Sequence, residues 1–589
     1  MTGADFTVVT EGLHKRFKAP DGQQFNAIDD ISLAIRAGEL TALVGPDGAG
    51  KTTLVRMMAG LLRPDAGTLQ VLGTDVQADP QAVQDRISYM PQRFGLYEDL
   101  SVEENLDLYA DLHGVPRDVR RERFGRMLEM TDLASFTQRP AGKLSGGMKQ
   151  KLGLACTLVR SPDLLLLDEP SVGVDPLSRR ELWKIIEQLI ADEQLSVIVS
   201  TAYMDEAERC AQVFVFNHGK LLAEGTPEDL RKKAKDLTYV AEAPADEPAR
   251  ELQALLIDAP DHVVDAVPKG GRIWFIRRPE TPERTLDTLL DGAPFEPRKA
   301  DLEDAFMLLL REHAEEAGDR GAGSPTQAIE RPDHHEENGP VIVVRDLVRK
   351  FGDFTAVAST SFDVQRGEIF GLLGPNGAGK TTTFRMLCGL LPATSGHLEV
   401  AGRDLRTARA KARARIGYVS QKFALYGNLT VRENLDFFAG AYGLDGSRAK
   451  DRVETVLKQF ELDPRAPSGI LPTGYKQRLA MAASLLHEPE ILFLDEPTSG
   501  IDPLARRVFW RTITALAQSG VTIVVTTHFM EEAEYCDRIA IQDAGRLLAI
   551  GTPAEVRAEG GEDAVDMNAA FIAIVERART ETRREGQAA

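Results

Sequence analysis

The chain has 589 residues, which is too long for one hydrophobic core and suggests about four domains. Its formal net charge of -20 disfavours nucleic acid as a partner, because an acidic surface repels a phosphate backbone unless its charge is locally reversed. The four cysteines include no CxxC pair, which argues against a zinc or iron–sulfur site and fits a reducing compartment such as the cytoplasm.

The N-terminal end carries no visible secretion signal, and the longest apolar runs, such as LLLL at 164–167, are strand-sized. We therefore expect no membrane-spanning segment. Residues 5–232 alternate short runs of Val, Ile and Leu with amphipathic helical patterns. This alternation predicts an α/β domain built on a largely parallel sheet.

The segment GPDGAGKTT at 45–53 is a phosphate-binding loop of the GxxxxGK[ST] type between an expected strand and an expected helix. Its glycines let backbone N–H groups and the helix N-terminus face anionic oxygens. We expect Lys51 to reach the β and γ phosphates of a nucleotide and Thr52 to bind Mg²⁺. The alternative, a plain Gly-rich turn before a helix, is disfavoured because the motif occurs twice. The predicted nucleotide-binding residues of this loop are Gly45, Gly48, Gly50, Lys51, Thr52 and Thr53.

The apolar strand LLLLDEP at 164–170 delivers two acids to the sheet edge where a nucleotide would lie. Asp168 is placed to bind Mg²⁺ and Glu169 to polarise an attacking water. An isolated Asp-Glu pair would more often begin a solvated helix, but downstream of a phosphate loop a catalytic role is favoured. The next expected strand ends in VSTAYMDEAERC at 199–210, which carries Ala202.

Residues 237–312 alternate strands and helices in an order that suggests a small ferredoxin-like α+β domain. Residues 313–338 are rich in Gly, Glu and Asp and predict a flexible acidic linker. Within this linker, His334, His335, Glu336 and Glu337 could suggest a metal site. A solvated polar tract explains these residues equally well.

Residues 340–557 repeat the first domain, with GPNGAGKTT at 374–382, ILFLDEP at 491–497 and VTTHFMEEAEYC at 525–536. The chain is therefore an internal duplication of one domain, and residues 558–589 add a C-terminal helix and tail. Two differences between the twins bear on the predicted site: His528 stands where the first copy has Ala202, and Asn376 stands where it has Asp47. In this copy we assign Asp495 and Thr381 to Mg²⁺ and Glu496 to catalysis. Its nucleotide-binding residues are Gly374, Asn376, Gly377, Gly379, Lys380, Thr381 and Thr382.

The segment LSGGMKQK at 144–151 resembles the signature motif of ATP-binding cassettes (ABC). With the phosphate loops, the LDEP strands, Gln92 and Gln421, this resemblance covers most of both repeats. It implies two P-loop nucleotide-binding domains that pair head to tail within the chain, each ATP lying between one phosphate loop and the other signature. Ser145 would cap a helix whose first N–H groups, at Gly146 and Gly147, face the γ-phosphate. Gln92 and Gln421 would contribute to Mg²⁺ binding.

The resemblance also gives His528 a switch role, contacting the γ-phosphate and holding the attacking water with Glu496; Ala202 can do neither. The second signature reads LPTGYKQR at 471–478, in which Pro472 and Thr473 are altered and Gly474 is kept. Head-to-tail pairing would put both departures in one composite site, leaving one consensus and one degenerate ATP site. Two aromatics sit where the family stacks adenine, with core packing as the alternative: Phe17 and Phe351.

Two further segments, FGLYEDLSVEENL at 94–106 and FALYGNLTVRENL at 423–435, resemble the receivers of membrane-partner coupling helices in exporters. ADLEDAF at 300–306 resembles the accessory domain of daunorubicin-type exporter ATPases. Overall the chain resembles the tandem ATPase subunit of bacterial multidrug exporters. This implies ATP and Mg²⁺ as cofactors, separate integral membrane permease subunits as a homo- or heterodimer, and a peripheral location at the cytoplasmic face of the inner membrane. The alternative is a soluble twin-cassette ATPase acting on ribosomes or nucleic acid; the transported substrate stays open.

Overall fold

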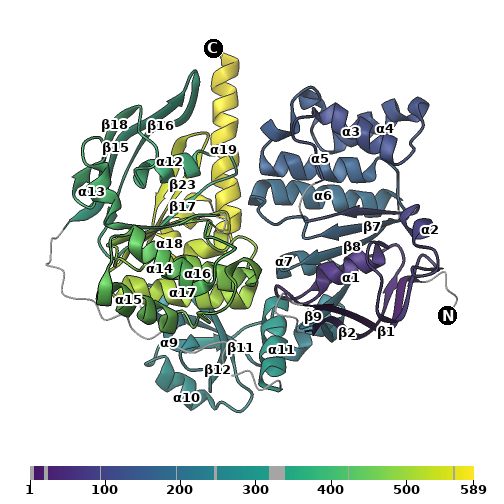
Figure 1. Cartoon of the computed structure of the whole chain (residues 1–589), viewed down its shortest axis with the longest axis horizontal. Coiled ribbons are helices and arrows are strands. Elements are labelled where there is room, and N and C mark those ends of the chain that lie inside the picture. Colours follow the sequence, from purple (N-terminus) through teal and green to yellow (C-terminus); the bar gives the residue numbers. More distant parts are fainter. Residues whose placement is uncertain are drawn as a thin grey trace. The chain divides into compact units, whose positions relative to one another are not determined.

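A computed structural model describes residues 6–18, 24–92, 95–193, 195–243, 248–316, 339–421, 424–561 and 564–588 (Figure 1). The chain forms two compact units. The first comprises Met1–Asp236 with Lys299–Arg320, and the second comprises Leu237–Arg298 with Gly321–Ala589. Most of the predicted acidic linker, including its His-His-Glu-Glu tract, lies outside the described residues.

The first unit contains a cassette built on two sheets. The smaller sheet is antiparallel, with strand order β2-β1-β4-β5. The larger sheet, in order β10-β9-β3-β8-β7-β6, is parallel except for β10. The strands are β1 (Phe6–Lys18), β2 (Gln24–Arg36), β3 (Leu40–Val44), β4 (Ala66–Val71), β5 (Thr74–Asp75), β6 (Ile87–Met90), β7 (Leu164–Asp168), β8 (Ser196–Thr201), β9 (Gln212–Asn217) and β10 (Lys220–Gly225).

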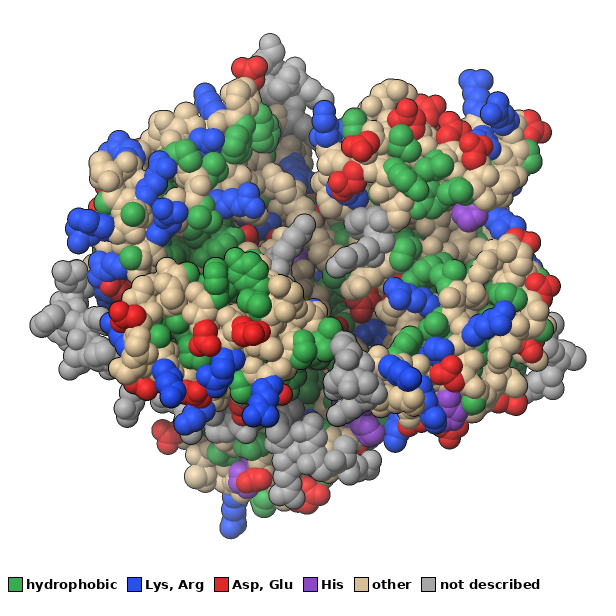
Figure 2. Space-filling view, in the orientation of Figure 1, with side chains coloured by type: hydrophobic (Ala, Val, Ile, Leu, Met, Phe, Trp, Pro, Cys, Tyr) green, Lys and Arg blue, Asp and Glu red, His purple; other side chains and the backbone are tan. Residues whose placement is uncertain are grey.

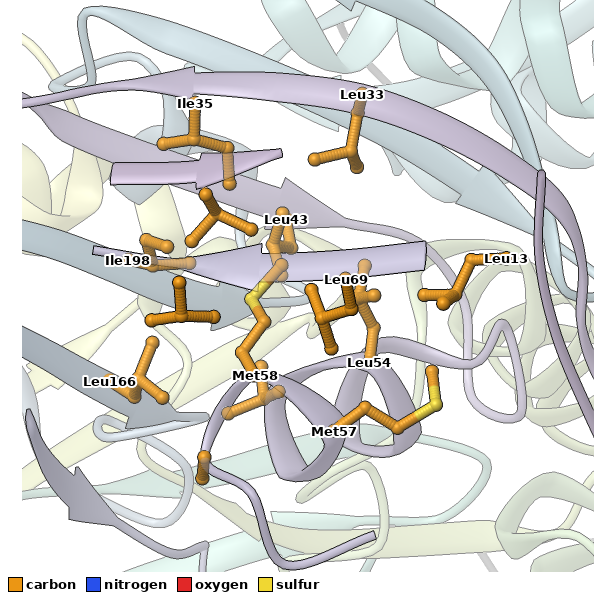
Figure 3. Packing of buried hydrophobic residues seen from close by; sticks show 14 of the residues in the cluster. Leu13, Leu33, Ile35, Leu43, Leu54, Met57, Met58, Leu69, Leu166 and Ile198 are labelled. Atoms are coloured by element: carbon orange, nitrogen blue, oxygen red, sulfur yellow. The ribbon is translucent and has the colours of Figure 1, made fainter. Parts of the chain in front are cut away.

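Helix α1 (Lys51–Met58) follows the phosphate loop and packs its apolar side into the core between these sheets. Leu54, Met57 and Met58 are fully buried there with Leu43 of β3 and Leu69 of β4 (Figure 3). This packing fixes the N-terminus of α1 against the sheet that carries the acids. The other helices of the unit are α2 (Pro80–Gln84), α3 (Val102–Leu112), α4 (Arg117–Met130), α5 (Gly146–Leu158), α6 (Pro176–Glu193), α7 (Met204–Ala207), α8 (Pro227–Arg231) and α11 (Leu302–Glu316).

The cassette of the second unit repeats this topology, with sheets ordered β16-β15-β18-β19 and β20-β21-β22-β17-β23-β24. The predicted tandem of two α/β domains is therefore confirmed. Its strands are β15 (Pro340–Phe351), β16 (Phe354–Gln365), β17 (Ile369–Leu373), β18 (Ser395–Val400), β19 (Arg403–Asp404), β20 (Ile416–Val419), β21 (Ile491–Asp495), β22 (Thr522–Thr527), β23 (Arg538–Asp543) and β24 (Arg546–Gly551). Its helices are α12 (Lys380–Leu387), α13 (Arg409–Arg413), α14 (Val431–Ala441), α15 (Gly446–Gln459), α16 (Thr473–Ser484), α17 (Pro503–Gln518), the 3₁₀ helix η5 (Met530–Tyr535), α18 (Pro553–Glu559) and α19 (Met567–Ala588).

A small domain occupies Leu237–Arg298 and belongs to the second unit. Its elements are β11 (Thr238–Glu242), α9 (Ala249–Ile257), β12 (Val263–Lys269), β13 (Arg272–Arg277), α10 (Glu283–Leu289) and β14 (Phe295–Pro297). The strands form an antiparallel sheet of order β12-β13-β11-β14. Its core includes Tyr239 and Phe275, whose rings stack with centroids 5.7 Å apart, and Leu252 of α9.

Helix α11, which the sequence-based boundaries assign to the accessory domain, packs instead on the first cassette. It contacts α7, α8 and β10, and the Leu302 N–H donates to the Glu208 carboxylate at 3.0 Å. In the second unit α19 makes the matching contacts with η5, α18 and β24. The small domain is thus inserted before a cassette's last helix. Among the described helices, none combines the length and apolar character needed to cross a bilayer.

Acidic and basic side chains are interspersed on the face seen in Figure 2. Over the whole chain the excess is acidic, with 90 Asp and Glu against 70 Lys and Arg. The negative charge is therefore spread across this face instead of forming one patch.

Candidate active site

In each unit the phosphate loop joins a buried strand to a helix, β3 to α1 and β17 to α12. Gly50 has φ 102°, and a Cβ there would lie 2.4 Å from the Ala27 carbonyl oxygen. Gly379 has φ 101° and would bring a Cβ within 2.5 Å of the Ala356 oxygen. Both positions therefore require glycine. The other predicted loop residues lie in the same two loops and first helical turns: Gly45, Gly48, Thr52, Thr53, Gly374, Asn376, Gly377, Thr381 and Thr382.

The loop lysines are buried and folded under their own loops. Lys51 Nζ donates to the carbonyl oxygens of Gly45 at 2.7 Å and Pro46 at 3.1 Å. Lys380 Nζ makes the same bonds, to Gly374 at 2.6 Å and Pro375 at 3.1 Å. Each loop therefore combines a fixed ammonium group with the helix N-terminus behind it, which is the arrangement that binds phosphate chains.

In each cassette the predicted acids stand at the end of one parallel strand, β7 or β21, which one strand separates from the strand of the phosphate loop. Thr52 Oγ1 donates to Asp168 Oδ1 at 3.0 Å. Glu169 and Glu496 follow the strand ends with φ 50° and 46°, a left-handed conformation that turns each side chain out of the strand. Burial raises the pKa of Asp495, and the hydrogen bond from Thr526 opposes that rise.

These oxygen groups fit Mg²⁺. Within the described residues no cluster of three His, Cys, Asp or Glu side chains could hold a metal alone. Mg²⁺ characteristically uses one or two protein oxygens together with substrate phosphates, so the pair of Thr52 and Asp168 is a suitable donor set. Thr381 and Asp495 hold the matching positions in the second cassette. The ion would neutralise charge on the β and γ phosphates when bound.

Gln92 and Gln421, which the resemblance assigns to Mg²⁺, hydrogen bond to the carboxylates predicted to be catalytic. Gln92 Nε2 donates to Glu169 Oε2 at 2.5 Å, and Gln421 Nε2 donates to Glu496 Oε2 at 2.6 Å. In this structure each glutamine amide therefore orients the carboxylate of its glutamate.

The two cassettes differ most at the switch position. His528 Nδ1 lies 3.4 Å from Glu496 Oε2, and neither ring nitrogen has a hydrogen-bond partner among the described residues. A buried ring with an unpartnered nitrogen beside a phosphate loop fits an interaction with bound phosphate. The first cassette has the buried methyl group of Ala202 in the same place.

This difference moves the pKa values of the two glutamates in opposite directions. Burial raises the pKa of Glu169, and Lys51 Nζ, 3.5 Å away, opposes this without reversing it. Burial also acts on Glu496, but His528 and the charge of Lys380 outweigh it and bring the pKa of Glu496 below its usual value. The surroundings of Glu496 therefore favour the ionised carboxylate, the form that a general base needs, more than those of Glu169 do.

The signature helices differ as well. Ser145 caps α5, its Oγ accepting the Met148 N–H at 3.3 Å, and α5 begins at Gly146. Gly147 packs so closely on α6 that a Cβ would lie 2.2 Å from Ser178 Oγ. In α16 the cap position is Pro472, which has no side-chain cap bond; Thr473 is the first helical residue and Gly474 follows. Only the first signature presents a capped, glycine-lined helix start.

The predicted adenine-stacking aromatics are not core residues. Phe17 is 37% and Phe351 47% exposed. Lys15 lies over the Phe17 ring at 5.7 Å, and Arg349 over the Phe351 ring at 4.4 Å. Each ring thus lies at the surface beside a basic side chain, which leaves it accessible for stacking.

Two hydroxyl groups missed by the sequence analysis connect the acids. Ser200 Oγ donates to Asp168 Oδ1 at 2.6 Å and accepts the Glu169 N–H at 3.0 Å. Thr526 Oγ1 does the same for Asp495 and Glu496, at 2.7 and 3.0 Å. The signal was present in the twin strands, where VST and VTT both place a hydroxyl residue two positions before the switch position.

Comparison with known proteins agrees with this geometry. The ABC transporter family matches residues 28–172 and 357–499. The chain is 48% identical over 583 residues to "Probable multidrug ABC transporter ATP-binding protein YbhF" of Escherichia coli, covering 97% of this chain and 98% of that one. It is 41% identical over 244 residues to "Linearmycin resistance ATP-binding protein LnrL" of Bacillus subtilis, covering 40% of this chain and 78% of that one. The chain therefore belongs to the ABC transporter family, as an ATP-binding subunit with two cassettes.

Proposed function

We propose that this ABC ATPase is the motor subunit of a bacterial multidrug exporter whose permease subunits are separate membrane-spanning chains. The observation that carries the proposal is the set of catalytic groups in the second cassette: Lys380 under its loop, Glu496 after its strand, and His528 3.4 Å from Glu496. Multidrug export is supported by the 48% identity to a relative named as a probable multidrug transporter subunit.

In this proposal Glu496 accepts a proton from water while the water oxygen bonds to the γ-phosphorus and the bond to the β–γ bridging oxygen breaks. Glu496 is suited to this step because His528 and Lys380 favour its ionised form, whose oxygen can take up the proton. His528 orients that carboxylate, and Lys380 supplies positive charge to the phosphates.

We further propose that the two ATP sites are unequal. The head-to-tail pairing implied by the family resemblance would combine the second phosphate loop with the capped signature at Ser145, which gives the consensus site. The first loop, which lacks a switch histidine, would be combined with the uncapped signature at Pro472. Loss of one hydrogen-bond donor that faces the charge developing in the transition state lowers the catalytic rate roughly 10²–10³-fold. The degenerate site would therefore bind ATP and hydrolyse it slowly.

The proposed permease contacts are two exposed tyrosine loops. Asn105 of α3 clamps Tyr97 with two bonds, accepting its N–H at 3.0 Å and donating to its carbonyl oxygen at 3.1 Å. Asn434 of α14 clamps Tyr426 in the same way, at 2.9 and 3.0 Å. A buried asparagine that fixes an exposed aromatic loop suits a rigid docking surface. Through these loops the chain would attach peripherally at the cytoplasmic face of the inner membrane.

Affinity capture of the tagged chain from detergent-solubilised membranes tests this function. We expect multispan membrane proteins to co-purify, and ATPase activity to require Glu496. Co-purification of ribosomes or nucleic acid without membrane proteins would support the soluble twin-cassette alternative and overturn the exporter proposal.

We also assign the small domain to the ferredoxin-like class. Support comes from its βαββαβ element order and its single antiparallel sheet. This domain has no equivalent in the second repeat, where residues 560–566 join α18 to α19 directly.

A further inference from the structure

The small domain is inserted in one cassette and packed on the other. Along the chain it follows α8 and precedes α11, which both belong to the first unit. In space it belongs to the second unit, where α9 contacts α17 (Figure 1). Both α9 and β12 also contact η5. The domain is therefore in a position to act on the cassette that keeps the switch histidine.

Its contact with α17 is an ionic one. Asp265 of β12 and Arg507 of α17 form a buried ion pair at 3.2 Å. Asp258, at the end of α9, accepts from Arg511 Nε one helical turn further on, at 2.9 Å. Paired charges buried in this way need defined geometry, so they fix where β12 lies along α17.

Charged side chains also connect the small domain to residues 528–537, here called the switch segment. The Gly271 N–H, in the turn between β12 and β13, donates to Glu534 Oε2 of η5 at 3.1 Å. Arg250 of α9 reaches Asp537, just after η5, with 2.5 Å between Nη1 and Oδ1. Because η5 begins two residues after His528, these bonds hold the backbone that carries the histidine.

Asp537 extends the connection to the phosphate loop. Its second oxygen accepts the Ile369 N–H at 2.8 Å, and the Asp537 N–H donates to the Ile369 carbonyl oxygen at 2.9 Å. Ile369 begins β17, the strand that leads into the loop of Lys380. One carboxylate therefore ties the small domain both to the switch segment and to the phosphate-loop strand.

The first cassette does not offer the same acceptor. Its twin sequence has Ala211 where the second has Asp537, although Glu208 still matches Glu534. Glu208 accepts the Leu302 N–H of α11 instead. The carboxylate that binds Arg250, Asp537, thus occurs only in the cassette that has all three proposed catalytic groups, Lys380, Glu496 and His528.

We propose that the small domain positions the consensus ATP site, and that Arg250 is the residue through which it holds the switch segment. The inference rests on hydrolysis by the second cassette, proposed above. Arg250 is a positioning residue, which acts through Asp537 on the segments of His528 and Lys380. Loss of this bond would leave ATP binding intact and misplace the histidine during turnover.

The test is Arg250→Ala in the purified full-length chain with MgATP. Asp537 is partly exposed and keeps its bonds to Ile369, so the variant leaves no buried charge unpaired. We expect kcat to fall about tenfold or more, because a small misplacement remote from the chemistry costs up to roughly 10²-fold. Binding of a fluorescent ATP analogue should stay unchanged, and Arg250→Lys, which keeps the charge, should recover part of the lost kcat.

The matched control is Arg272→Ala, which removes an exposed arginine of the same domain whose partner, Glu296 at 3.9 Å, lies within that domain. An unchanged kcat in Arg250→Ala would overturn the proposal. An equal loss in Arg272→Ala, or weaker binding of the analogue in step with kcat, would also overturn it, because either result indicates general destabilisation. A wild-type chain without ATPase activity would instead contradict the proposed function.

Discussion

His528 Nδ1 lies 3.4 Å from Glu496 Oε2, whereas Glu169 of the first cassette has only Ala202 in the equivalent place. The two glutamates otherwise make the same bonds: each carboxylate accepts from a glutamine amide, and each backbone N–H donates to a hydroxyl oxygen of the neighbouring strand. Their pKa shifts nevertheless have opposite signs, raised for Glu169 and lowered for Glu496. The histidine therefore distinguishes two glutamates whose own hydrogen bonds are otherwise alike.

The first prediction compares Glu496→Gln with Glu169→Gln. The amide keeps the size of the side chain but cannot accept a proton, so Glu496→Gln should lower steady-state ATPase activity by about 10²-fold or more. Glu169→Gln should have a much smaller effect, because its site already lacks the switch histidine. Equal losses in the two variants would indicate two competent or alternating sites and would contradict the asymmetry.

The second prediction concerns pH. The base must be ionised, so activity is present above the pKa of Glu496 and is lost as pH falls through it. His528→Ala removes the main group that lowers this pKa, leaving Lys380 to oppose burial and the nearby charge of Asp495. The pKa of Glu496 should then rise, and the acid limb of the kcat profile should move to higher pH.

The matched control for that profile is His397→Ala, which removes a histidine on β18 of the same cassette with partly exposed partners Glu399 and Asp404. Its acid limb should coincide with that of the wild type. An acid limb that stays in place in His528→Ala would show that the histidine does not set the charge state of Glu496.

Much of each cassette could be predicted from sequence because its chemistry is local. The phosphate loop needs glycine where the backbone has positive φ, as at Gly50, and its strand–loop–helix setting is visible in the pattern of apolar runs. The order of the motifs also predicted the tandem, which the repeated sheet topology confirms.

The packing of the small domain could not be predicted in this way. Asp265 and Arg507 are 242 positions apart and look like ordinary surface charges, because nothing in their neighbouring residues indicates burial. The sequence indicated the start of this domain at 237, but nothing in its composition indicated the return to the first unit at Lys299. Pairing across such distances depends on tertiary structure, which local patterns do not encode.

A third prediction tests the signature helix. Ser145→Ala removes the cap of α5 and should lower stability by about 1 kcal/mol. It should also reduce ATPase activity as Glu496→Gln does, if the proposed pairing brings this helix to the consensus site. Thr226→Ala is the control: it removes the cap of α8, where Thr226 Oγ1 accepts the Asp229 N–H at 3.1 Å. The control should lower Tm by a similar amount and leave ATPase activity unchanged.

The fourth prediction concerns membrane attachment. Tyr97→Asp and Tyr426→Asp place a charge on the exposed loops held by Asn105 and Asn434. Both variants should leave the membrane fraction when the permease subunits are present, and both should keep ATP binding. Val565→Asp, a charge placed on another exposed apolar residue, should remain attached. Persistent attachment of the double tyrosine variant would contradict docking through these loops.

The last prediction is that a histidine at position 202 is not sufficient to repair the first site. The backbone there is already suited to it: the Tyr203 N–H donates to Thr201 Oγ1 at 3.0 Å, just as the Phe529 N–H donates to Thr527 Oγ1 at 2.9 Å. Ala202→His should therefore lower the raised pKa of Glu169, as His528 does for Glu496.

Turnover should still be limited by the altered signature, since catalytic groups act as a unit and not additively. The measurement uses the Glu496→Gln background, in which the residual ATPase activity reports the first site. Ala202→His alone, and Pro472→Ser with Thr473→Gly alone, should each raise that residual rate by less than about threefold, whereas all three substitutions together should raise it by roughly tenfold or more. Full recovery from Ala202→His alone would mean that the signature at 471–478 is competent as it stands, and that the missing histidine accounts for the whole difference between the sites.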